Sequence, residues 1–150
     1  MIIGGIDPGL KGGIAVQNED GEVFAYSMPD TKADILALLR ELFPAGSNAV
    51  VYCEKVGRPR PGSASGSVAT FANHCGHLEM ALLAIPIRHH YVSPTVWMKI
   101  SAAGAPKGDG NKTKRKNFIK TRMQERFPGL KITHATSDAL GILAYAIGDL

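Results

Sequence analysis

The sequence predicts an α/β protein in which helices flank a mixed sheet of five strands. Residues 1–28 contain three short apolar runs separated by turn signals, which indicates three antiparallel strands. Strand-like and helix-like segments then alternate, which favours parallel strands joined by helices. The chain has 150 residues, a length that fits one domain over residues 1–150 with a sizeable core.

The first three strands follow from alternating apolar residues and turn signals. Residues 1–7 and 12–18 are expected to form a hairpin, because a proline and a glycine interrupt the apolar run at 8–11. Residues 22–28 alternate and are rich in aromatic and β-branched residues, which predicts a third strand after the turn at 19–21.

Capping residues and helical periodicity define the later elements. Asp30 or Thr31 caps a helix that ends at Pro44, and a strand at 48–56 is apolar enough to be buried on both faces, with Glu54 near its end. In chain order, we then expect a loop at 57–66, a helix at 67–84, a strand at 85–92, a short helix at 93–101, a loop at 102–111, a basic helix at 112–127 and a last helix within 134–150. The short helix has a proline in its first turn. Asp138 opens the last helix, and Thr136 or Ser137 is its expected cap.

Basic residues are concentrated in one part of the chain. The formal net charge is +4, but residues 99–131 contain ten lysines and arginines against two acids, Asp109 and Glu125. A focused basic surface predicts a polyanionic partner such as nucleic acid, with a solubilising helix surface as the alternative.

The composition points to a cytoplasmic protein. The 45% hydrophobic content includes no apolar run of the ~20 residues needed to span a membrane, and the amino terminus lacks the features of a secretory signal. Cys53 and Cys75 lie in apolar segments and are expected to be reduced, buried thiols. We expect a bacterial or phage-type cytoplasm and no membrane partner, with an organelle or a virus factory as alternatives.

Three carboxylates, Asp7, Glu54 and Asp138, have apolar or small neighbours. Asp7 and Glu54 end two strands that lie side by side in parallel if the chain crosses over through the helix between them. Carboxylates brought together repel one another, and a divalent cation removes that repulsion. Such ligands suit Mg²⁺ or Mn²⁺, and two ions about 3.5–4 Å apart could clamp the attacking and leaving oxygens of a phosphodiester. A helix cap or a surface charge is the alternative for each carboxylate taken alone.

One of the histidines, His134, is a candidate for this site. His134 lies four residues before Asp138, so both share one face if the last helix includes His134. It is a candidate metal ligand or proton shuttle, with a surface histidine as the alternative. His89 and His90 lie in or after a strand and are expected to be structural.

Five segments, in order along almost the whole chain, resemble the RuvC-type Holliday junction resolvases of the RNase H-like superfamily. They are "GIDPGLKGGIAV", "VVYCEKV", "TFANHCGHLEMAL", "KTKRKNFIKT" and "SDALGILAYA". The resemblance implies an RNase H-like fold and a metal-dependent endonuclease that resolves four-way DNA junctions by paired symmetric nicks. It also implies two Mg²⁺ or Mn²⁺ ions per active site.

The resemblance further implies roles for single residues. Asp7, Glu54 and Asp138 would be the metal-binding catalytic carboxylates, and Lys112 would lie near the scissile phosphate. Relatives usually carry Asp or His three residues before the last Asp, where this chain has Ala135, so His134 is expected as the fourth ligand.

The loop after Glu54 lacks the aromatic wedge of some relatives, so Pro59 or Pro61 is the candidate wedge. The expected DNA-binding residues are Lys11, Arg58, Arg60, Lys99, Lys112, Lys114, Arg115 and Lys116. Close approach of a phosphate backbone is expected at Gly9, Gly12 and Gly13.

The resemblance also implies a homodimer that binds four-way or branched DNA. The helix at 67–84 is the candidate dimer face, with packing on the sheet as the alternative, through its apolar residues Val68, Phe71, Leu78, Leu82 and Leu83. The competing functions are another RNase H-like nuclease acting on branched DNA or RNA–DNA hybrid, a non-catalytic junction-binding protein, and a sugar-kinase or actin-like ATPase, which needs two such domains. The sequence does not indicate a helicase partner.

Overall fold

The computed structural model describes residues 1–57, 62 and 64–149. Its elements are, in chain order, β1 (Ile2–Asp7), β2 (Gly13–Gln17), β3 (Val23–Ser27), α1 (Lys32–Leu42), β4 (Ala49–Glu54), α2 (Ser65–Ala84), β5 (Arg88–Val92), α3 (Pro94–Ser101), the 3-10 turn η1 (Asp109–Asn111), α4 (Lys112–Arg126) and α5 (His134–Asp149). The predicted α/β fold class is confirmed, and each expected element is present.

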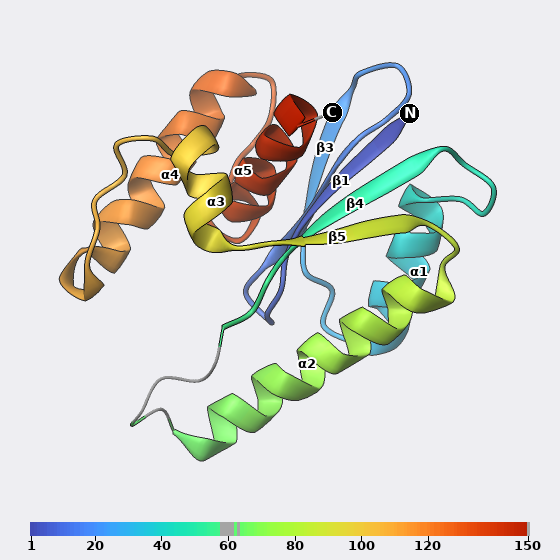
Figure 1. Ribbon diagram of the computed structural model, residues 1–150, viewed down its shortest axis with the longest axis horizontal. Helices are drawn as coiled ribbons and strands as arrows, with labels where there is room; N and C mark the ends of the chain where they lie inside the picture. Colours follow the sequence, from blue (N-terminus) through green and yellow to red (C-terminus); the bar gives the residue numbers. More distant parts are fainter. Residues whose placement is uncertain (58–61, 63, 150) are drawn as a thin grey trace.

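The five strands form one mixed sheet in the order β3-β2-β1-β4-β5 (Figure 1). The β1–β2 and β2–β3 pairs are antiparallel, while β1–β4 and β4–β5 are parallel. Because α1 carries the chain across from β3 to β4, β1 and β4 end at the same edge of the sheet. This is the arrangement that the crossover predicted for Asp7 and Glu54.

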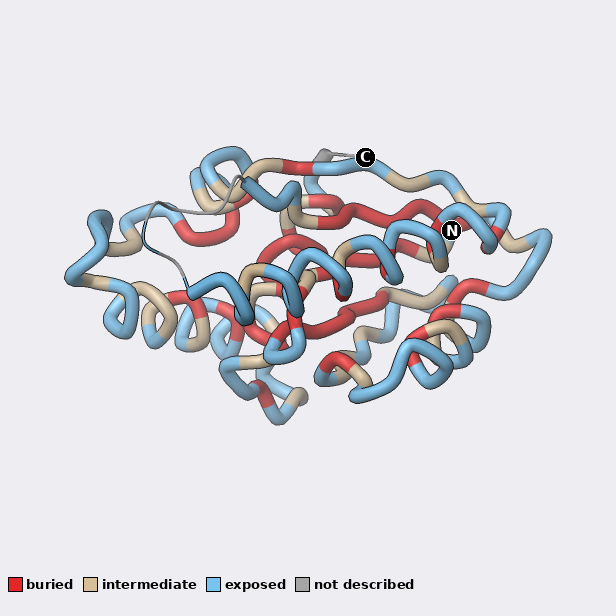
Figure 2. Tube along the Cα trace, turned by 90° about the horizontal axis from the view of Figure 1, so that it is seen from below, coloured by how far each residue is buried: buried red, intermediate tan, exposed pale blue. Residues whose placement is uncertain are grey.

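Helices cover both faces of the sheet, with α3, α4 and α5 on one side and α1 and α2 on the other (Figure 1). Residues of β4 alternate between two cores: Val50 and Tyr52 pack on the α5 side, and Val51 and Cys53 on the α1 side. Figure 2 shows the buried strands in red between helices whose outer sides are exposed. Burial on both faces explains why β4 is apolar almost throughout.

Glycines of the first hairpin let α5 lie directly on the sheet. A Cβ at Gly5 would be 2.5 Å from the carbonyl oxygen of Ala139 and from the backbone nitrogen of Leu143. A Cβ at Gly13 would clash with the carbonyl oxygen of Ala135. The backbone of α5 therefore crosses β1 and β2 at a distance that no side chain permits.

One of the two expected caps of α1 is observed, whereas the caps expected for the last helix are not. Thr31 caps α1, since its side chain accepts a hydrogen bond from the Asp34 backbone N–H. The expected cap of the last helix was wrong, because α5 begins at His134 and the Thr133 hydroxyl accepts from the Thr136 N–H at 3.3 Å. Asp138 consequently lies one turn inside the helix rather than at its opening.

The long helix α2 packs on the rest of the molecule along one side only. Leu78 and Leu82 are buried, whereas Phe71 and Leu83 are exposed. The expected dimer face is thus divided, because two of its members belong to the protein's own core. Among the described residues, no helix is both long and apolar enough to cross a membrane.

Candidate active site

Asp7 and Glu54 lie next to each other at the carboxyl ends of β1 and β4. The parallel register pairs Ile6 with Cys53, so the residues that follow each of them are neighbours at the sheet edge. Asp138 reaches the same region from the first turns of α5, which the glycines of the hairpin hold close to β1. Three carboxylates from distant parts of the sequence are brought together in this way.

The three carboxylates act on one another electrostatically. Burial is the main cause that raises the pKa of Asp7, to about 8, and the charges of Asp138 and then Glu54 raise it further. Lys116 opposes this rise and also lowers the pKa of Glu54 and of Asp138. Lys116 is therefore the cation shared by the whole acidic group.

Glu54 is held in place by Trp97 of α3. The indole Nε1–H donates to Glu54 Oε2 at 2.8 Å. Burial raises the pKa of Glu54, and this hydrogen bond opposes the rise. Trp97 is only 1% exposed and its ring lies against Gly141 of α5, where a Cβ would be 2.6 Å from the ring. One buried ring thus links the orientation of Glu54 to the position of α5.

Asp138 has a buried oxygen without a partner. Within the described part of the chain, no hydrogen-bond partner lies near Asp138 Oδ1. Burial raises the pKa of this carboxyl group, while Lys116, Arg115 and His134 lower it. An unsatisfied buried carboxylate oxygen is costly unless a cation or a donor binds it.

A cleft of about 200 Å³ joins the carboxylates to the basic helix α4. Its polar side chains come from β4, α4 and α5: Glu54, Lys112, Arg115, Lys116 and Asp138. Arg115 and Lys116 are half-buried, whereas Lys112 is exposed. A phosphate placed in this cleft would meet three cations beside two of the carboxylates.

His134 is exposed at the start of α5. A hydrogen bond of 2.9 Å joins its Nε2 to Asn117 Oδ1 of α4. It shares a helix face with Asp138, as its spacing predicted, and lowers the pKa of Asp138. The ring is exposed, so its expected role as fourth ligand stays a prediction.

The three carboxylates are of the donor type that binds a divalent cation, but they are not gathered closely enough to form a complete set of ligands. Among the described residues, no three His, Cys, Asp or Glu side chains converge closely enough to hold an ion. Mutual repulsion at Asp7 and the free oxygen of Asp138 are nevertheless the features that a bound cation would relieve. Oxygen donors of this kind suit Mg²⁺ or Mn²⁺.

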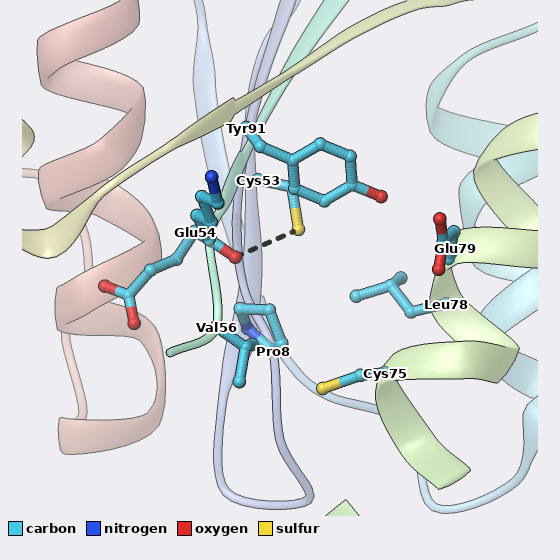
Figure 3. Close-up of a pocket in the computed structure, with 9 residues that line it drawn as sticks. Pro8, Cys53, Glu54, Val56, Cys75, Leu78, Glu79 and Tyr91 are labelled. Atoms are coloured by element: carbon cyan, nitrogen blue, oxygen red, sulfur yellow. Dashed lines mark hydrogen bonds between the residues drawn. The ribbon is translucent and has the colours of Figure 1, made fainter. Parts of the chain in front are cut away.

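A second cavity, of about 260 Å³, lies on the opposite face of β4. Cys53, Cys75, Leu78 and Tyr91 line it, and Figure 3 shows the carboxylate of Glu54 pointing away from it. Burial raises the pKa of the Cys53 thiol, which disfavours the reactive thiolate form. Cys75 is half-buried rather than buried as expected.

The other expected DNA contacts do not line the cleft in the part of the chain that the structure describes. Lys11, Lys99 and Lys114 are exposed. Arg58, Arg60, Pro59 and Pro61 lie outside the described residues.

The glycines of the first turn allow close packing within the protein, and the expected approach of phosphate there stays a prediction. A Cβ at Gly9 would meet Phe71, one at Gly12 would clash with the carbonyl oxygen of Asp7, and Gly13 contacts α5.

Sequence reasoning missed the roles of Trp97 and Lys116. Trp97 was placed on a short helix without a function, although it is the only tryptophan of the chain. Lys116 was counted as one basic residue among many. The buried Ile119 and Met123 of α4 carry a usable signal, because helical spacing from them puts Lys112, Arg115 and Lys116 on the inner side.

The sequence matches no known protein family, and no curated protein matches it at a significant level. Its structure is similar to that of Thermus thermophilus RuvC in complex with Holliday junction substrate, with 18% identity and a TM-score of 0.60 over 97% of this chain and 91% of that one. For the yeast mitochondrial Holliday junction resolvase Ydc2, identity is 19% and the TM-score 0.50, over 97% and 77% of the two chains. For Fowlpox virus resolvase in complex with Holliday junction DNA, the values are 11% and 0.51, over 99% of both.

These similarities define the class of fold. The chain has the RNase H-like fold found in RuvC and related Holliday junction resolvases, as the sequence motifs implied. At 11–19% identity the likeness establishes the fold, and activity has to be argued from the site.

Proposed function

We propose that this chain is a metal-dependent endonuclease that resolves four-way DNA junctions. The observation that carries the proposal is the meeting of Asp7, Glu54 and Asp138 beside a cleft lined by lysine and arginine. Acidic groups for a metal next to cations for a phosphate suit phosphodiester hydrolysis. The RuvC and Fowlpox virus structures with the same fold contain Holliday junction DNA, which supports this substrate class.

The three carboxylates would hold Mg²⁺ or Mn²⁺, two ions per site. When bound, such ions supply an activated water and stabilise the leaving oxygen. Lys112 would meet the phosphate at the exposed mouth of the cleft. Arg115 and Lys116 would neutralise phosphate charge deeper in the cleft, and Trp97 would keep Glu54 in a fixed orientation.

Binding would rest on the basic surface rather than on the acids. Lys11, Lys99 and Lys114 are exposed, and phosphate contacts from such side chains would give affinity without sequence preference. We expect junction affinity to fall steeply with salt.

A homodimer would place two such sites on two symmetric strands. The outer side of α2 exposes Met80 at 65% and Leu83 at 63%. Large apolar side chains gathered on one helix are typical of an interface. A symmetric pairing of α2 with its copy would match the two-fold symmetry of a junction.

The direct test compares substrates under matched conditions. Synthetic four-way junction, linear duplex and RNA–DNA hybrid are incubated with the protein and either Mg²⁺ or EDTA. Paired symmetric nicks in the junction alone, absent with EDTA, are expected. Cleavage of the hybrid would indicate another RNase H-like nuclease, and a junction that is bound but never cut would indicate a binding protein.

A further inference from the structure

A hollow on the β5 side of the cleft has no part in the proposed reaction. Its volume is about 500 Å³, within the range of small-molecule sites. Tyr52, His90 and Tyr145 line it together with Val96, Ser93 and Lys55. The sequence placed His90 as structural, but this ring is exposed at the edge strand.

Aromatic rings are the main feature of this hollow. The Tyr52 ring lies 5.3 Å from that of His90, at 44°, and 5.8 Å from that of Tyr145, at 73°. Tyr52 is buried, Tyr145 half-buried and His90 exposed, so the rings descend from the surface to the floor. Rings at several tilts offer both face and edge contacts to a flat aromatic ligand.

The charge of the hollow favours an anionic ligand. Lys55 lies at its border, and within the described residues no carboxylate side chain lines it. The aromatic surface therefore stands beside a cation, which is the combination that binds single nucleotides of a strand.

The hollow is close to the proposed reaction centre. Lys55 directly follows Glu54, and Tyr145 lies seven residues after Asp138 on α5, about 10 Å along a helix. That separation corresponds to about three nucleotides of a stacked strand.

We propose that this hollow receives one unpaired nucleobase of the bound DNA, stacked on Tyr145 and His90, with Lys55 on the adjoining phosphate. The inference rests on the proposed function, because a strand held in the cleft would bring the base there. The edge of the sheet at β5 would then recognise a DNA strand rather than bind another protein.

Photo-crosslinking tests the proposal directly. Junctions carrying one 5-iododeoxyuridine, at each position within five nucleotides of the crossover, are irradiated with the protein in EDTA. The crosslinked peptide is then identified by mass spectrometry. At one or two positions we expect attachment to Tyr145 or His90. The same probe is placed in a short single-stranded oligonucleotide.

Three variants separate the outcomes. Tyr145→Leu and His90→Ala should remove the crosslink and weaken oligonucleotide binding about fivefold or more. His77→Ala, an exposed histidine on α2, should change neither. Because His90 is exposed, its variant keeps the test valid even if Tyr145→Leu fails to fold.

Crosslinks that map only elsewhere, or that persist in both variants, would overturn the proposal. A protein that neither binds nor cuts junctions, yet crosslinks the oligonucleotide through Tyr145 or His90, would retain the base site and refute the proposed function. Normal junction cleavage without crosslinks to Tyr145 or His90 would support the proposed function and refute the base site.

Discussion

At the scale of single residues, the site depends on how its carboxylates are held. Glu54 receives a hydrogen bond from Trp97, and Asp138 keeps one buried oxygen free. Burial and two nearby negative charges disfavour the ionised form of Asp7 and raise its pKa to about 8. The three carboxylates therefore differ in their surroundings: one accepts a hydrogen bond, one has a buried oxygen without a partner, and one has a raised pKa.

The hydrogen bond of Trp97 gives a first prediction. Trp97→Phe replaces the indole with a smaller aromatic ring that has no N–H donor, so Glu54 loses its fixed orientation. We expect the Mg²⁺ concentration for half-maximal junction cleavage to rise about tenfold, and the Mg²⁺-induced rise in melting temperature to need more metal. A purely structural role for Trp97 predicts a lower melting temperature with unchanged Mg²⁺ dependence.

The raised pKa of Asp7 gives a second prediction, for the metal-free protein. The folded state holds this proton up to about pH 8, whereas an unfolded Asp loses it near pH 4, so stability falls as pH rises between these values. The slope is at most about 1.4 kcal/mol per pH unit. Asp7→Asn cannot ionise, so its melting temperature in EDTA should exceed that of the wild type by more at pH 8 than at pH 5.

The matched control for this measurement is Asp30→Asn, which changes an exposed carboxylate before α1. If the melting temperatures of Asp7→Asn and the wild type differed by the same amount at pH 5 and at pH 8, the electrostatic account would be contradicted.

At the scale of elements, the sequence predicted the order and type of every strand and helix. Local signals sufficed where an element is regular: a cap at Asp30 or Thr31, of which the structure shows Thr31, for the start of α1, and continuous apolar residues for the buried β4. The start of α5 was misplaced because Thr133, Thr136 and Ser137 are all acceptable caps, and only tertiary packing selects among them.

The role of Gly5 could not be predicted either, since close packing joins residues more than 130 positions apart, such as Gly5 and Ala139. Gly5→Ala should push α5 away from β1 and lower the free energy of unfolding by about 1–3 kcal/mol, measured by urea denaturation. Gly76→Ala on α2 is the control, because no atom lies within 4 Å of its added Cβ, and a slight gain is expected. A Gly5→Ala protein as stable as the control would refute the close packing.

At the scale of the whole molecule, the proximity of Asp7 and Glu54 could be predicted because the ends of two paired parallel strands must meet, whereas Asp138 reaches them from the helix α5. The cations that face them could not be predicted, since α4 is basic on several sides and the sequence alone did not select Lys116 over Lys112. The fourth ligand expected at His134 depended on helix spacing; its ring contacts Asn117 in the structure, and its role as a ligand stays a prediction.

The exposed side of α2 gives a prediction about assembly. Leu83→Glu should convert a homodimer into monomers in sedimentation equilibrium, because it places a charge in the apolar surface. Ile100→Glu on α3 changes an equally exposed apolar residue elsewhere and should leave the dimer intact. A wild-type protein that is monomeric at all concentrations would contradict the pairing through α2.

The central claim is that Asp7, Glu54 and Asp138 form the reaction centre of a junction-cutting enzyme. Its most direct test measures binding and cleavage of one synthetic four-way junction by the wild type and by Asp7→Asn, in Mg²⁺. The account predicts that Asp7→Asn binds the junction as tightly as the wild type but cuts it at least about a thousandfold more slowly, because binding rests on the basic residues and catalysis on the acids. Cleavage by Asp7→Asn at the rate of the wild type would contradict it.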